Sequence, residues 1–198
     1  MHKYTWTLSG YDILNPRSRD QDTNYITAKL LVNDQPIGAP QTKSMGNQGK
    51  GAYGAVGFTW ADVDVPDELP ATTVKLCYQI MNLGHVKAAD ALIAMPEIMA
   101  RTGTMAREEH ESDDSSTIDW AVLIGKWLLT AGIQALLADC DGPIGPREGR
   151  IVVWHSFELL AAPQGVTSEE TVHEHGNNSP TGCGSNSRYD VHFSTLRH

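Results

Sequence analysis

The stretch "TVKLCYQIM", residues 73–81, decides the fold class of this chain. Successive side chains of an extended strand point to opposite faces of a sheet. One face would carry Val74, Leu76, Tyr78 and Ile80, and the other would carry Lys75, Cys77, Gln79 and Met81. Alternation with a period of two is typical of a β-strand, so this stretch predicts a strand in an antiparallel sheet.

The same period of two recurs on both sides of this stretch, with turn-forming residues between the runs. The runs are "YTWTLSG" (4–10), "NYITAKLLVN" (24–33), "GAVGFTWADVDV" (54–65), "RIVVWHSFEL" (150–159), "EETVHEH" (169–175) and "SRYDVHFST" (187–195). Several short alternating strands separated by turns indicate antiparallel sheets packed as a sandwich or closed as a barrel. We therefore expect a mainly β chain folded as an antiparallel β-sandwich.

The middle of the chain has a different pattern, which predicts an inserted apolar helical segment at about 88–138. Its second half, "STIDWAVLIGKWLLTAGIQALLADC", has a helix start signal and few polar residues. The polar residues Asp119, Lys126, Thr130 and Gln134 fall on one narrow stripe of a helix over residues 118–138. Such a helix packs on the sandwich or in a homo-oligomer interface, or it enters a membrane, where Lys126 would be costly.

A chain of 198 residues fits one domain. We expect a single domain over residues 1–198, with the sandwich built from 1–83 and 150–198. The formal net charge of -9 argues against nucleic-acid binding, which depends on Lys and Arg neutralising phosphates. The start "MHKYTWTLSG" has no apolar signal-peptide core. Extracellular location by a route without a signal peptide is favoured, and a cytoplasmic location is the alternative.

The stretch "TVHEHGNNSPTGCGSNSRYDVHF", residues 171–193, predicts a hairpin with a histidine-rich face. If its loop is symmetric, His173 lies opposite Asp190 and His175 lies opposite Arg188. One interpretation is a solvated outer face with a cross-strand His–Asp pair. The other is a transition-metal site that uses His173, His175 and either His192 or Asp190.

A second candidate metal site lies before the second predicted strand. Asp20, Asp22 and Asn24 stand at alternating positions in "DQDTN", and oxygen ligands in a loop are what calcium uses. Further acidic residues, Asp62, Asp64 and Asp67, could contribute ligands. The EF-hand pattern fails, and the alternative interpretation is a solvated turn before a strand.

The three cysteines occupy different contexts. Cys77 lies within a predicted strand and is interpreted as a small core residue. Cys140 and Cys183 lie in turns beside glycines, and they are either bridged by a disulfide or two unrelated thiols.

Four segments, "SRDQDTNYITAKLLVN", "KSMGNQGKG", "CDGPIG" and "SPTGCGSNSRYDVHF", carry a resemblance. Together they resemble a family of small bacterial and fungal proteins that are uncharacterised. These proteins share a DTDY-like stretch, a CDGP turn and a C-terminal GCGSNS-Tyr motif, and often have an apolar insertion before the CDGP turn. The resemblance implies the same two-part organisation and favours the Cys140–Cys183 pair, and it implies no reaction or ligand.

Catalytic motifs such as G-x-S-x-G and H-E-x-x-H do not occur in the sequence, so we lean toward a protein that is not an enzyme. The first hypothesis is a non-enzymatic binding or membrane-interacting β-sandwich that acts outside the producing cell. One alternative is a calcium-dependent module for carbohydrate or another ligand, with Asp20, Asp22 and an aromatic such as Trp60. The other is a metal-dependent hydrolase that uses the histidine-rich hairpin.

Overall fold

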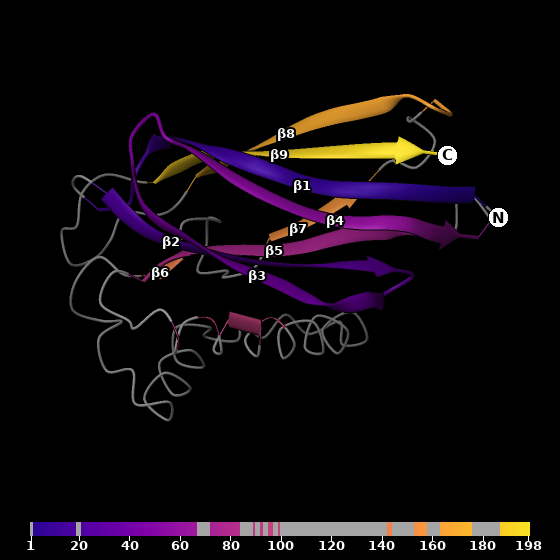
Figure 1. The fold of residues 1–198 in the computed structure, drawn as a ribbon, viewed down its shortest axis with the longest axis horizontal. Helices are drawn as coiled ribbons and strands as arrows, with labels where there is room; N and C mark the ends of the chain where they lie inside the picture. Colours follow the sequence, from indigo (N-terminus) through magenta and orange to yellow (C-terminus); the bar gives the residue numbers. More distant parts are fainter. Residues whose placement is uncertain are drawn as a thin grey trace, which may run out of the picture.

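The protein is mainly β and consists of two antiparallel sheets stacked face to face (Figure 1). The computed structural model describes residues 2–18, 21–66, 72–83, 142–143, 153–157, 163–175 and 187–198, and the single residues Ala89, Leu92, Met95, Pro96 and Met99. The predicted mainly β class and antiparallel pairing are confirmed.

The first sheet has four strands in the order β4-β1-β9-β8. They are β1 (His2–Asn15), β4 (Tyr53–Val65), β8 (Thr167–His175) and β9 (Arg188–Arg197). The first and last strands of the chain are neighbours, with Tyr4 opposite Arg197, so both described ends lie at one end of this sheet. The sandwich therefore closes only when residues from the two ends of the sequence pair.

The second sheet has the order β3-β2-β5, with β6 and β7 both paired to β5. Its strands are β2 (Gln21–Val32), β3 (Gln35–Gly49), β5 (Val74–Asn82), β6 (Gly142–Pro143) and β7 (Val153–Phe157). The stretch quoted first, residues 73–81, supplies nearly all of β5, which is the central strand of this sheet.

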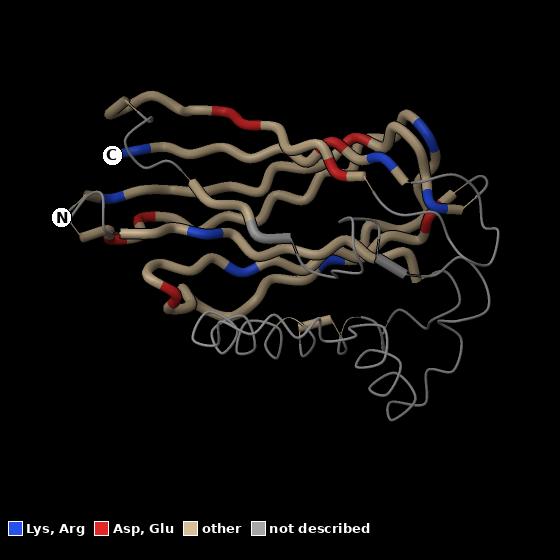
Figure 2. Tube along the Cα trace, turned by 180° about the vertical axis from the view of Figure 1, so that it is seen from behind, with Lys and Arg blue, Asp and Glu red and all other residues tan. Residues whose placement is uncertain are grey.

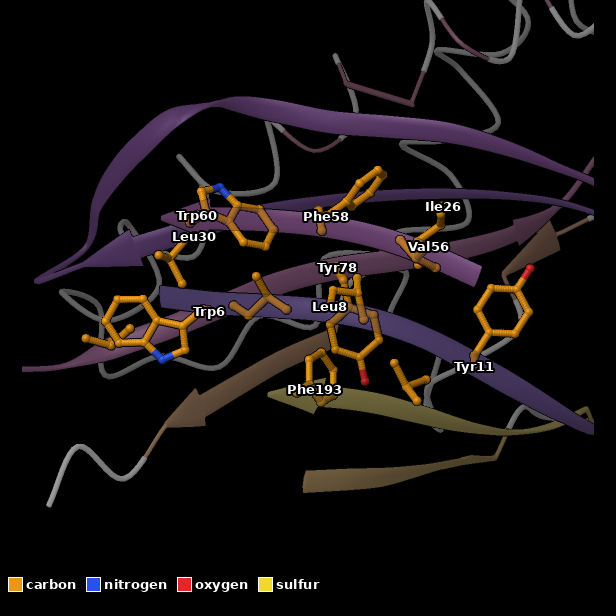
Figure 3. Packing of buried hydrophobic residues seen from close by; sticks show 14 of the residues in the cluster. Trp6, Leu8, Tyr11, Ile26, Leu30, Val56, Phe58, Trp60, Tyr78 and Phe193 are labelled. Carbon is orange, nitrogen blue, oxygen red and sulfur yellow. The ribbon is translucent and has the colours of Figure 1, made fainter. Parts of the chain in front are cut away.

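The core lies between the two sheets and is formed by every second residue of their strands (Figure 3). Trp6 and Leu8 of β1 pack there with Tyr78 of β5 and Phe193 of β9, and all four are almost fully buried. Trp60 of β4 also belongs to this core. The interpretation of Trp60 as a loop aromatic for a ligand is therefore wrong, because its indole faces the opposite sheet.

The strand β5 is buried on both faces, which its alternation alone did not indicate. Cys77 and Gln79 face away from the core but have no exposed surface. The Sγ atom of Cys77 lies 3.2 Å from Sδ of Met99, and the Nζ atom of Lys29 donates to the Met99 carbonyl at 3.2 Å. Chain from the predicted insertion therefore covers part of this outer face.

The helical insertion over about 88–138 lies almost entirely outside the described residues. Within the described part of the chain the structure contains no continuous helix. The predicted helix at 118–138 is wholly outside that part.

Side-chain hydrogen bonds join the two sheets along both lateral edges of the sandwich. On one side, Lys43 of β3 donates from Nζ to the carbonyls of Ala55 and Val56 in β4, at 2.8 and 3.1 Å. On the other side, Tyr78 donates to Glu174 of β8 at 2.6 Å. Two carbonyls of the edge strand β4 are thus occupied, which limits pairing of that part of the edge with another strand.

Candidate functional site

The outer face of the four-stranded sheet is the candidate site. Strand pairing aligns one residue from each strand across it: Tyr53 lies opposite Asp12, Asp12 opposite Asp190, and Asp190 opposite His173. The adjacent line contains Gly10, His192 and Thr171. We term this surface the outer polar face and define it by Gly10, Asp12, Tyr53, Thr171, His173, Asp190 and His192.

The ring of Tyr53 is seated on a glycine. A Cβ atom placed on Gly10 would lie 2.4 Å from Oη and 2.6 Å from Cζ of Tyr53, which is closer than real Cβ contacts. The phenol end of the ring therefore covers Gly10, and only glycine leaves room for it. The side chain is nevertheless 53% exposed, so the ring has one side on the sheet and another in solvent.

The imidazole of His192 is held by hydrogen bonds at both ring nitrogens. Its Nε2 lies 3.0 Å from Oδ2 of Asp12, and its Nδ1 lies 3.0 Å from Oγ1 of Thr171. A carboxylate only accepts, so Nε2 carries a proton and donates, and in the neutral ring Nδ1 accepts from the Thr171 hydroxyl. The ring centroid is 6.2 Å from that of Tyr53, which places a fixed polar group beside an exposed aromatic ring.

The predicted pair His173–Asp190 is present. His173 lies opposite Asp190, His175 lies opposite Arg188, and Nδ1 of His173 lies 2.7 Å from Oδ1 of Asp190. The predicted register of the C-terminal hairpin is confirmed. By the same donor rule, Nδ1 of His173 donates to the carboxylate, which leaves Nε2 of this exposed side chain as an acceptor in the neutral ring.

The described residues of this hairpin show no assembled transition-metal site, and that interpretation stays a prediction. His173, His175, Asp190 and His192 all lie in the described strands, yet no group of three or more His, Cys, Asp and Glu side chains there could hold a metal ion. The reason is geometric, because His173 binds Asp190 while His192 turns the other way, toward Asp12 of β1.

Asp22 and Asn24, the described residues of the calcium interpretation, are both fully buried, and that interpretation stays a prediction. Asp22 is fully buried, and its carboxylate accepts four hydrogen bonds. The donors are the backbone amides of Arg17 and Ser18, the side-chain amide of Asn82 and the phenol of Tyr189. These bonds use the oxygen lone pairs that a cation would need. Asp20 and Asp67 lie outside the described residues, and Asp62 and Asp64 belong to β4 of the other sheet.

The Asp22 cluster is therefore structural. Asn24 donates from Nδ2 to the hydroxyl of Tyr189 at 3.0 Å, and the Tyr11 hydroxyl donates to Oε1 of Gln48. Burial is the main cause that raises the pKa of both Tyr11 and Tyr189 above the usual range, and the nearby Asp22 charge adds to it. Both phenols consequently remain neutral donors in the folded protein.

Cys77 is confirmed as a buried free thiol. Burial raises its pKa to about 12, so the thiol is not a nucleophile at neutral pH. The predicted disulfide partners Cys140 and Cys183 lie outside the described residues.

Sequence reasoning missed Asp12, Gly10 and Tyr53. Asp12 and Gly10 belong to the first strand and Tyr53 begins the fourth, so nothing in their local pattern links them to the C-terminal histidines. A signal that could have found Gly10 is its position within an alternating strand, where glycine often marks a bulge or a close approach. The register between Leu8 and Gly10 does shift at this point.

No helix in the described part of the chain is long and apolar enough to cross a membrane.

The comparisons with known proteins assign no family: no family model matches the chain, and no curated protein matches its sequence.

Proposed function

We propose that this protein is a non-enzymatic binding β-sandwich whose ligand docks on the outer polar face. The proposal rests on the position of Tyr53. Its ring packs over Gly10, and its side chain is more than half exposed. An aromatic ring that is rigidly placed yet open to solvent supplies contact area at low cost in conformational entropy.

The polar groups around Tyr53 support the same proposal. His192 is hydrogen-bonded to Asp12, and His173 is hydrogen-bonded to Asp190. These four polar side chains are therefore positioned before any ligand binds. Asp12 and Asp190 stand directly opposite one another, although like charges at such positions are destabilising. A ligand that donates hydrogen bonds to both carboxylates would relieve this repulsion.

The test uses two exposed apolar side chains of the same sheet. Tyr53 and Val166 are each 53% exposed, but Val166 precedes β8 at the end of the sheet away from Tyr53. Wild type, Tyr53→Ala and Val166→Ala are applied to immobilised neutral glycans, acidic glycans, and vesicles of phosphatidylcholine with and without phosphatidylserine. We expect wild type and Val166→Ala to bind at least one probe that Tyr53→Ala no longer binds. Binding that Tyr53→Ala retains in full, or no binding to any probe, contradicts it.

We also propose that residues 88–138 form the helical insertion and cover the outer face of the five-stranded sheet. Helical backbone at Ala89, Leu92, Met95, Pro96 and Met99 supports this, as do the contacts of Met99 with Lys29 and Cys77. Membrane entry and homo-oligomer formation through residues 118–138 depend on chain outside the described residues. The vesicle probes also test membrane entry. Vesicle binding through residues 118–138 should be unchanged in Tyr53→Ala, because the substitution lies outside that segment.

A further inference from the structure

We infer that the ligand of the outer polar face is a neutral glycan, with one pyranose ring stacked on Tyr53. The inference rests on the proposed function and adds the chemical class of the ligand. It follows from the combination of one exposed aromatic plane with carboxylate and imidazole groups beside it.

A pyranose presents an apolar face of C–H groups and a rim of hydroxyl groups. The exposed side of the Tyr53 ring matches the apolar face, because C–H groups pack favourably on an aromatic plane. Asp12 lies directly opposite Tyr53 in the strand pairing and is about half exposed, so its carboxylate can accept from hydroxyls on the rim. The surface thus offers both kinds of contact that one sugar ring requires.

The lateral extent of the face suits a chain of sugars. From Tyr53 on β4 to His173 on β8 the line crosses three strand spacings, which is roughly 14 Å at the usual separation of strands. This span is longer than a single pyranose. Asp190 and the acceptor nitrogen of His173 at the far end can each accept from a hydroxyl of a further sugar.

The charges on this line disfavour an acidic ligand. Asp12 and Asp190 are the two carboxyl groups along it, and the chain as a whole has a formal net charge of -9. Arg188 lies two positions before Asp190 on the same face of β9, and the other basic positions are distributed over strands of both sheets (Figure 2), so a single guanidinium stands beside the two carboxylates. Uronic acids, sulfated sugars and anionic lipid headgroups would be repelled.

The experiment measures affinity for neutral oligosaccharides of glucose, mannose, galactose and N-acetylglucosamine, each beside a uronic-acid or sulfated glycan of similar length. Wild type should bind at least one neutral glycan. Tyr53→Ala should weaken that binding by about tenfold or more, as expected for the loss of an aromatic contact, while Tyr53→Phe retains it. Asp12→Asn should weaken it less than Tyr53→Ala, and Val166→Ala should leave it unchanged. The circular dichroism spectrum of each variant checks that it has folded.

The outcomes separate the two proposals. If only acidic glycans or vesicles are bound, and Tyr53→Ala abolishes that binding, the proposed function stands and the neutral-glycan inference is overturned. If a neutral glycan is bound equally by wild type and a folded Tyr53→Ala, both the site and the inference are wrong. Absence of binding to every neutral glycan also overturns the inference.

Discussion

The phenol of Tyr189 donates a hydrogen bond of 2.7 Å to the carboxylate of Asp22 across the interior of the sandwich. Tyr189 lies in β9 of one sheet and Asp22 in β2 of the other, so this bond joins the two layers. Backbone amides of Arg17 and Ser18 complete the set of donors together with Asn82. A buried carboxylate with this many donors fixes the chain before β2 and the relative position of the sheets.

Replacement of Asp22 by alanine should destabilise the fold strongly. The change leaves buried donors without an acceptor, and we expect the free energy of unfolding to fall by roughly 3–5 kcal/mol. Urea unfolding followed by tryptophan fluorescence measures it. The control is Asp64→Ala, which removes an exposed ion pair with Lys3 at 3.4 Å and should cost less than about 1 kcal/mol. Equal losses for the two variants would contradict the structural role of Asp22.

Three of the six tyrosines should ionise only when the protein unfolds in alkali. Burial is the largest cause that raises the pKa of Tyr11, Tyr78 and Tyr189, and for Tyr78 the Glu174 carboxylate adds to it. Above about pH 10 the unfolded chain loses these protons and the folded chain keeps them, so stability falls as pH rises. Tyrosinate absorbance and circular dichroism, recorded in one titration, should show these groups ionising together with loss of structure. Full ionisation of all six while the fold persists would be the contrary result.

Replacement of Gln79 by methionine should stabilise the protein. Neither amide atom of Gln79 has a hydrogen-bond partner in the described structure, although the side chain is fully buried. Methionine has a similar shape and needs no partner, so the free energy of unfolding should rise by about 1–2 kcal/mol. The matched control is Gln48→Met, which removes the acceptor of the Tyr11 hydroxyl and should lower stability. A loss of stability in Gln79→Met would show that its amide is satisfied in solution.

The seat of Tyr53 on Gly10 can be tested by a double-mutant cycle. Gly10→Ala places a Cβ atom against the Tyr53 phenol and within 2.5 Å of the Gly54 carbonyl oxygen, which should cost about 1–3 kcal/mol. In the Tyr53→Ala background the ring is absent and the cost should be smaller, because part of the overlap is gone. Thermal unfolding of the four proteins gives the coupling. If the two costs simply add, the ring does not cover Gly10.

The disulfide between Cys140 and Cys183 stays a prediction. Protein purified without reductant from an oxidising compartment, then denatured, should have one free thiol out of three cysteines. That thiol should be Cys77, which is buried in the native protein and should react with an alkylating reagent only after denaturation. Three free thiols in such a preparation would contradict a disulfide between Cys140 and Cys183.

The sequence by itself determined most of the strands and part of the histidine face, but it did not predict β3, Gln35–Gly49. A period of two is a local property, so β5 and the C-terminal hairpin, with His173 opposite Asp190, could be derived from neighbouring residues alone. The metal sites could not be judged in this way. Whether Asp22 offers its oxygens to a cation or fills them with hydrogen bonds depends on Tyr189 and Asn82, which are distant in sequence.

The tertiary structure alone decided the composition of the outer polar face. Pairing of β1 with both β4 and β9 brings Asp12 next to Tyr53 on one side and Asp190 on the other. The register shift near Gly10 places that glycine under the Tyr53 ring. No pattern within a single strand encodes such neighbours, because they arise from contacts between segments that meet only when the sandwich closes.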